Sequence, residues 1–148
     1  MRLSRHTDYA LRVLIHLAAN DGRPSSIAQI SRAYGISENH LMKVVHMLGR
    51  AGFIVTTRGR GGGIRLARAA EEISLGAVVR RSEAGMDLAD CGTCIIAPAC
   101  GLTGALAEAL AAFLAVLDRY SIADATIRRS ALAELLGLAP ALEAAALD

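Results

Sequence analysis

The chain has 148 residues, of which 53% are apolar and 20% charged, so its composition fits one folded domain and excludes a disordered polar chain. Aromatic residues make up only 3%, so aliphatic side chains must build the core, which favours helices over a strand-rich sandwich. The longest apolar stretch, at residues 105–117, is interrupted by Glu108 and is too short to span a bilayer. The first residues form no export signal, so we expect a cytoplasmic protein with no membrane partner.

Charge is distributed unevenly along the chain. Residues 1–68 contain 11 basic and 3 acidic side chains, whereas residues 69–148 contain 5 basic and 11 acidic ones. A basic half joined to an acidic half indicates that the first half meets a polyanion. The alternative is a solvated surface that is rich in Arg.

Three helices are predicted in the first 52 residues. Apolar residues at helical spacing predict the first over residues 7–19 (Leu11, Leu14, Ile15 and Ala18 on one stripe). Ser25 or Ser26 is expected to cap a second helix that ends near residue 34, because a hydroxyl can accept from the free amides of a first turn. A third helix begins after Ser37 and ends at Gly52. Its predicted apolar stripe comprises Leu41, Val44, Val45 and Leu48, with Met47 among the polar residues of the remaining surface.

A β-hairpin follows the third helix. The β-forming segments 53–57 and 64–67 flank the Gly-rich turn 58–63. The order helix, short helix, turn, helix, hairpin is that of a winged helix-turn-helix. A phosphate-cradling loop is disfavoured, since no Gly-Lys-Ser/Thr follows and the turn leads into a strand.

Double-stranded DNA is the polyanion that this arrangement suits. The major groove admits a helix whose polar face points at base edges, and a hairpin with Arg at its tip can reach phosphates or the minor groove. Asn39 has the chemistry to pair with adenine and Lys43 with guanine. The candidate DNA-binding residues are Ser26, Ser37, Asn39, His40, Lys43, Arg50, Arg58, Arg60 and Arg65.

All three cysteines lie within ten residues, after a short helix predicted at residues 74–81. Cys91, Cys94 and Cys100 are odd in number, so they cannot all pair in disulfides, and thiolates this close can surround one soft metal centre. Composition leaves zinc and an iron–sulfur cluster both open, and no fourth Cys or His follows at residues 101–104. A redox dithiol enzyme is disfavoured because the pair does not lie between a strand and a helix.

The longest helix is predicted over residues 102–120. Its seam residues are spaced 4, 3, 4 and 3 apart, as in a coiled coil: Leu106, Leu110, Phe113, Leu117 and Tyr120. An ordinary core helix is the alternative, because the seam covers only about two heptads. A homodimer joined through this seam would place two recognition helices on successive major grooves. The chain then breaks near residues 121–124 and restarts a helix toward residue 136.

The fold class expected is mainly α with a small β-hairpin. A winged helix-turn-helix domain at residues 1–83 precedes a cysteine loop at 84–101, dimerisation helices at 102–137 and a flexible tail at 138–148.

Four segments together resemble the Rrf2 family of bacterial winged-helix regulators: residues 3–12 (LSRHTDYALR), 36–44 (ISENHLMKV), 58–66 (RGRGGGIRL) and the cysteine loop. Residues 96–100 and 113–124 are most similar to the nitric-oxide-sensing repressors of that family. The resemblance implies a homodimeric repressor, not an enzyme, with one iron–sulfur cluster in each subunit. A 4Fe–4S cluster is favoured and a 2Fe–2S cluster is the alternative.

The resemblance also implies roles for individual residues. Cys91, Cys94 and Cys100 match the three cluster cysteines, and Asp8 matches a carboxylate that completes the cluster from the partner subunit. Operator DNA would be released when nitric oxide reacts with the cluster or when the cluster is lost.

The sequence departs from the family pattern at the cysteines. Two residues separate Cys91 from Cys94, where the family usually has four or five. Thr103 stands where cluster-sensing members carry a His, which argues against their chemistry. The alternative function is therefore a regulator of the same family that senses iron, cluster status or redox state through these cysteines, with zinc or as a thiol switch.

Overall fold

The structure is a computed structural model, which describes residues 2–138. Its elements in chain order are α1 (Arg5–Ala19), α2 (Ile27–Tyr34), α3 (Glu38–Arg50), β1 (Ile54–Thr57), β2 (Gly63–Leu66), η1 (Ala70–Glu72), α4 (Leu75–Ser82), η2 (Ala97–Ala99), α5 (Gly101–Asp118), α6 (Ile122–Ala125) and α7 (Arg129–Leu135). The predicted fold class, mainly α with one small hairpin, is confirmed. Apart from Leu138, the predicted tail lies outside the described residues.

Serine hydroxyls cap the N-termini of helices α1, α2, α3 and α4. Ser4, Ser26, Ser37 and Ser74 each accept a hydrogen bond from the backbone amide three residues further on. Such caps satisfy amides that have no partner inside the helix. Of the two caps predicted for α2, Ser26 is the one used, and the Gln29 side chain completes a capping box with it.

The two strands form an antiparallel hairpin in which Ile54 pairs with Leu66 and Thr57 with Gly63. A third segment joins this hairpin, because Ser25 exchanges two backbone hydrogen bonds with Ile64, of 2.9 and 2.8 Å. The wing is therefore attached to the turn before α2 as well as to α3.

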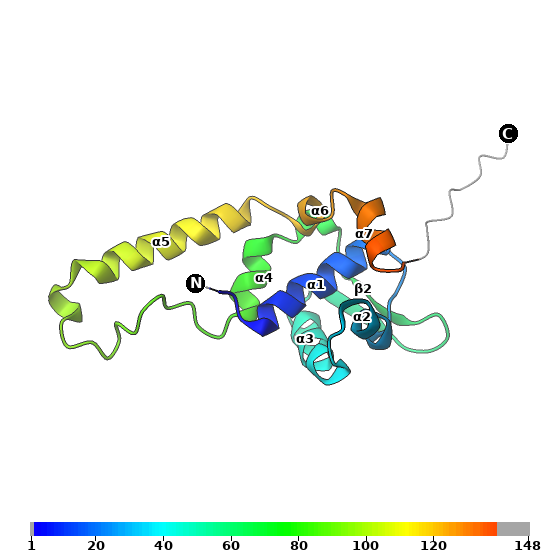
Figure 1. The fold of residues 1–148 in the computed structure, drawn as a ribbon, viewed down its shortest axis with the longest axis horizontal. Coiled ribbons are helices and arrows are strands. Elements are labelled where there is room, and N and C mark those ends of the chain that lie inside the picture. The colour runs from blue at the N-terminus through cyan, green and yellow to red at the C-terminus, as the bar shows by residue number, and fades with distance from the viewer. Residues whose placement is uncertain (1, 139–148) are drawn as a thin grey trace.

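Helix α1 lies at the centre of the molecule, in contact with α3, α4, α6, α7 and β2 (Figure 1). Because other elements surround α1, its buried residues lie on more than one side of the helix. Val13 and Leu17 are fully buried, whereas Leu11 and Ile15, which the sequence placed on the inward stripe, are half-buried. Core residues from the other elements include Ile30, Leu41, Val44, Leu48, Ile54, Ile73, Val78 and Ile122.

Helix α5 projects from this body. The segment after α4 runs outward, and α5 returns along its 18 residues to α6 (Figure 1). Where α5 meets α4, the Arg80 guanidinium donates two 2.6 Å hydrogen bonds to the Asp118 carboxylate. Farther on, Arg129 at the start of α7 forms an ion pair with Asp21, which holds α7 near the end of α1.

No residue of α5 is buried within the chain. Its mean hydropathy over 18 residues is 1.6, so by length and composition alone it could cross a membrane, although the apolar stretch considered in the sequence covers only residues 105–117. A single apolar helix is weak evidence for a membrane span, and an unpartnered apolar face equally needs a protein partner.

Candidate DNA-binding surface and cysteine loop

Helix α3 is held by its apolar side and exposes its polar side. Leu41, Val44 and Leu48 are buried against the core, which turns the opposite face to solvent. The predicted DNA-binding residues on or next to α3 are all exposed: Ser37, Asn39, His40, Lys43 and Arg50. The structure thus brings these five together on one surface, as a recognition helix requires.

The two predicted serines have local structural roles. The Ser26 hydroxyl accepts a hydrogen bond from the Gln29 amide, and Ser37 accepts one from His40 and lies 3.0 Å from His40 Nδ1. Each serine therefore fixes the first turn of its helix, where free amides point outward and suit a phosphate.

Two residues of α3 were not among the sequence-based candidates. Met42 is 50% exposed, and His46 is exposed beside it. Both line a shallow cavity of about 460 Å³ between α2, α3 and β1. The sequence placed Met47 on the polar face instead, but Met47 packs against the core. Residue 47 is the neighbour of the buried Leu48, so its side chain lies at the edge of the apolar stripe and reaches the core.

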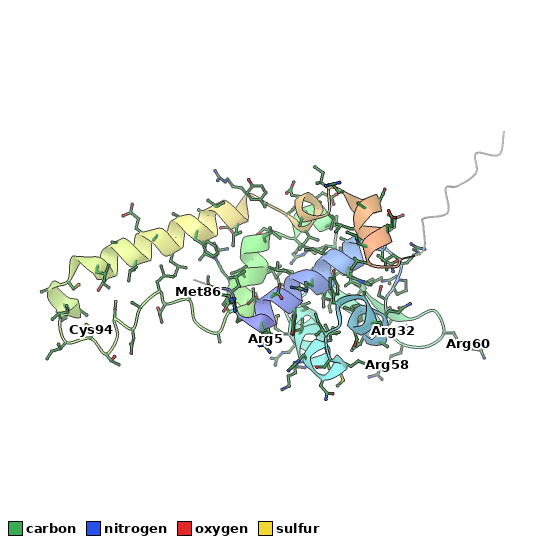
Figure 2. The ribbon with its side chains drawn as sticks, viewed as in Figure 1. Arg5, Arg32, Arg58, Arg60, Met86 and Cys94 are labelled. Atoms are coloured by element: carbon green, nitrogen blue, oxygen red, sulfur yellow. The ribbon has the colours of Figure 1, made fainter. Side chains whose placement is uncertain are left out.

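The wing carries the other basic candidates. Arg58, Arg60 and Arg65 are exposed, and within residues 2–138 none of them forms an ion pair with an acidic side chain. Arg60 stands at the outer end of the hairpin loop (Figure 2). Unneutralised guanidiniums on a projecting hairpin are suited to backbone phosphates.

The cysteine loop lies at the other end of the molecule from the wing, as the positions of Cys94 and Arg60 show (Figure 2). All three thiols are free, with Cys94 exposed and Cys91 and Cys100 half-buried. The loop is folded by short turns, in which the Cys94 amide donates to the Cys91 carbonyl and the Cys100 amide to the Ala97 carbonyl, both at 3.3 Å. Among the described residues, no three His, Cys, Asp or Glu side chains are close enough to hold one metal ion.

Asp8 is not near the cysteines of its own chain. It lies in the first turn of α1, close to Arg5, whereas Cys94 is at the far end of the loop (Figure 2). Its carboxylate accepts a 3.0 Å hydrogen bond from Arg12 and lines an open cavity of about 480 Å³. Three free thiols on one loop are the donor chemistry of an iron–sulfur cluster, and an exposed carboxylate is accessible to a second chain.

The predicted seam of α5 is partly covered by the chain itself. Leu106, Leu110, Phe113 and Leu117 are half-buried, while Tyr120 is 49% exposed. Two large apolar side chains of α5 are more exposed, Leu102 at 56% and Val116 at 44%.

A helix-turn-helix with an exposed basic second helix, followed by an Arg-tipped hairpin, defines a winged-helix DNA-binding protein. Residues 3–127 match the family described as "Rrf2: Iron-dependent Transcriptional regulator". The chain therefore belongs to the Rrf2 family, and it is a DNA-binding transcriptional regulator, not an enzyme.

Curated relatives match along nearly the whole chain. The HTH-type transcriptional regulator NsrR of Bacillus subtilis (strain 168) is 48% identical over 142 residues, which cover 92% of this chain and 97% of that protein. The regulator of the same name from Halalkalibacterium halodurans is 46% identical over 146 residues, covering 95% of this chain and 100% of that protein.

Solved structures share the fold. T. potens IscR has a TM-score of 0.70 at 25% identity, covering 86% of this chain and 88% of that one. The oxidized form of Staphylococcus aureus CymR has a TM-score of 0.70 at 28% identity, covering 84% of this chain and 95% of that one.

Proposed function

We propose that this regulator is a homodimeric repressor that binds an iron–sulfur cluster through the cysteine loop and releases operator DNA in response to nitric oxide. The observation that carries the proposal is the position of three free thiols between α4 of the DNA-binding half and the exposed apolar helix α5. The similarity to regulators named NsrR over more than nine-tenths of the chain supports the same assignment.

Four residues would serve as ligands to the cluster. Cys91, Cys94 and Cys100 would supply thiolate ligands, and Asp8 of the second subunit would supply an oxygen ligand. When bound, an iron–sulfur cluster supplies iron at which nitric oxide can bind. Because Asp8 belongs to α1, at the centre of the DNA-binding half, a ligand set shared between two chains would restrain the spacing of the two α3 helices.

The coupling free energy that this mechanism requires is small. A hundredfold loss of operator affinity corresponds to about 2.7 kcal/mol of coupling between the cluster site and the DNA site. Loss of the restraint through Asp8 is a sufficient source, since metal–ligand bonds contribute free energy on this scale.

Purification without oxygen tests the cofactor. The protein should be brown and should contain both iron and inorganic sulfide, while Cys100→Ala should lose both. Ser82→Ala, which changes a buried hydroxyl outside the loop, is a control for general damage to the fold. A parent protein that is colourless and contains zinc or only free thiols would instead establish the alternative, a zinc or thiol-switch regulator, which the free and exposed Cys94 thiol favours.

Asp8→Ala tests the proposed link between subunits. The three cysteines should still assemble a cluster, but its visible spectrum or its effect on DNA affinity should change. Arg12→Ala is the matched control, because it breaks the same ion pair and leaves the carboxylate in place. If Asp8→Ala equals the parent in both spectrum and DNA response, Asp8 is not a ligand.

A further inference from the structure

A second concave site lies on the opposite side of the DNA-binding half from the cysteine loop. It is a cavity of about 560 Å³ between the end of α1, α2 and the residues that follow α7. Its volume lies in the range of small-molecule sites. Neither the cysteine loop nor the exposed face of α3 contributes to it, so the proposed function makes no use of it.

The cavity is lined by a buried histidine that has no partner. His16 is 1% exposed, and neither of its ring nitrogens has a hydrogen-bond partner among the described residues. The ring contacts Tyr34 at a centroid distance of 6.0 Å, which packs one side of it without satisfying a nitrogen. Buried polar groups of this kind are rare, because leaving one unpaired costs about 1–3 kcal/mol.

Burial also affects the protonation state of His16. Removal from water lowers the pKa of His16 below its usual value of 6.5, so the ring is neutral at pH 7. A neutral imidazole offers one N–H donor and one acceptor nitrogen to an occupant of the cavity.

The other described residues that line the cavity are basic, neutral polar or apolar, and none of them is acidic. Arg23 comes from the turn before α2 and Arg32 from α2 itself. Asn20 and Gln29 add amides, and Leu136 and Leu138 add an apolar wall. Arg32 projects from α2 at the surface (Figure 2). Guanidiniums recognise carboxylates, often through two parallel hydrogen bonds. Cations on one side and aliphatic groups on the other suit a carboxylate that has an apolar body.

We infer that this cavity binds a small organic carboxylate, held by Arg32 at the mouth and by His16 at the floor. A phosphate of the DNA backbone fits less well, because it is part of a duplex that is too bulky to enter a cavity of about 560 Å³. The occupant would lie against Ser25, whose backbone is paired with Ile64 of the wing. The site is thus placed beside the attachment of a predicted DNA-contacting element.

Titration of the full-length chain with benzoate, monitored by the imidazole C–H resonances in NMR, tests this inference. Benzamide has the same shape without the charge and serves as the matched probe. We expect a saturable shift of the His16 resonance with benzoate and little or no shift with benzamide, while His6 and His40, which do not line the cavity, stay unchanged. The experiment needs neither DNA nor iron, so its failure is distinguishable from failure of the proposed function.

Two variants locate the site. Arg32→Ala should weaken benzoate binding about tenfold, the effect of losing one charged hydrogen bond. Arg81→Ala removes an exposed charge from α4, outside the cavity, and should bind benzoate as the parent does. Equal shifts with benzamide, an unsaturating shift shared by all four histidines, or equal binding by Arg32→Ala would each overturn the inference. A His16 shift produced by duplex DNA but not by benzoate would overturn it too, and would assign the cavity to the DNA surface.

Discussion

The Glu83 carboxylate accepts a 2.7 Å hydrogen bond from the backbone amide of Ser4, and so links the end of α4 to the residue that caps α1. Ser4 in turn caps α1 through its hydroxyl, which accepts from the Thr7 amide. The segment that carries the cysteines begins directly after Glu83, and α1 carries Asp8. This bond therefore fixes one end of the cysteine loop to the helix whose Asp8 is the proposed ligand of the cluster in the other subunit.

Glu83→Gln should lower the free energy of unfolding by about 1–2 kcal/mol at pH 7, because it weakens hydrogen bonds to a charged acceptor. Burial alone would raise the pKa of Glu83, but hydrogen bonds from Thr7 and Ser4 outweigh it, and the pKa lies below its usual value of 4.5. The stabilisation is therefore complete above pH 4.5 and is lost as the pH falls through the lower folded-state pKa. Urea unfolding at several pH values measures it.

Glu108→Gln on the exposed surface of α5 is the control, and it should leave stability unchanged at pH 7. A parent and a Glu83→Gln variant that differ by the same amount at pH 7 and pH 3 would show that the charge on Glu83 is not the source of the effect.

Gly76→Ala should destabilise the junction of α4 and α5. A Cβ at Gly76 would collide with the Asp118 carboxylate, which is held in place by its two hydrogen bonds to Arg80. We expect a lower melting temperature and weaker coupling between Arg80 and Asp118 in a double-mutant cycle. Gly49→Ala is the control: nothing lies within 4 Å of a Cβ there, so it should stabilise α3 by about 0.5–1 kcal/mol. Equal melting temperatures for Gly76→Ala and the parent would refute the predicted collision.

Arg60→Ala should weaken DNA binding and reduce its dependence on salt. If Arg60 neutralises one phosphate, the slope of log K against log salt concentration should become less negative by about 0.9. Fluorescence anisotropy with a duplex at several salt concentrations measures the slope. Arg81→Ala, which removes an exposed charge from α4, should leave the slope unchanged. A slope equal to that of the parent would remove the wing tip from the phosphate contacts.

Val116→Glu should convert the proposed dimer to a monomer. Val116 is 44% exposed on a helix that has no buried residue within its own chain, so a charge there enters whatever surface covers α5. Light scattering after gel filtration gives the mass. Ala115→Glu is the matched control, since residue 115 lies two turns from Glu108 on the same face of α5. If Val116→Glu remains a dimer, this face of α5 is not the interface.

Much of the fold could be predicted because local rules agree with the tertiary structure. Serine caps, glycine at turns, apolar residues at helical spacing and β-forming segments set the bounds of α1 to α4 and of the hairpin to within about two residues. The burial of α1 could not be predicted in the same way. Its position at the centre of the molecule buries His16 and Val13 outside the predicted stripe, and a single stripe presupposes that only one side of a helix is covered.

The site could be predicted in part. Exposure of Asn39, Lys43 and Arg60 follows from the polar face of a short helix and from a glycine-rich hairpin, both of which are local features. Met42 was missed because an apolar residue on an exposed face gives no signal in composition, although methyl groups of thymine are read by such side chains. The relation of Asp8 to the cysteines depends on a second chain, so neither local pattern nor one chain's contacts determines it, and it stays a prediction.

The most direct test of the central claim is the dissociation constant of the protein for its operator DNA, measured without oxygen before and after addition of nitric oxide. We expect the iron- and sulfide-containing protein to bind tightly, and nitric oxide to weaken binding about a hundredfold. Cys100→Ala should bind as weakly as the treated protein. Unchanged affinity after nitric oxide, or tight binding by iron-free protein, would contradict the account.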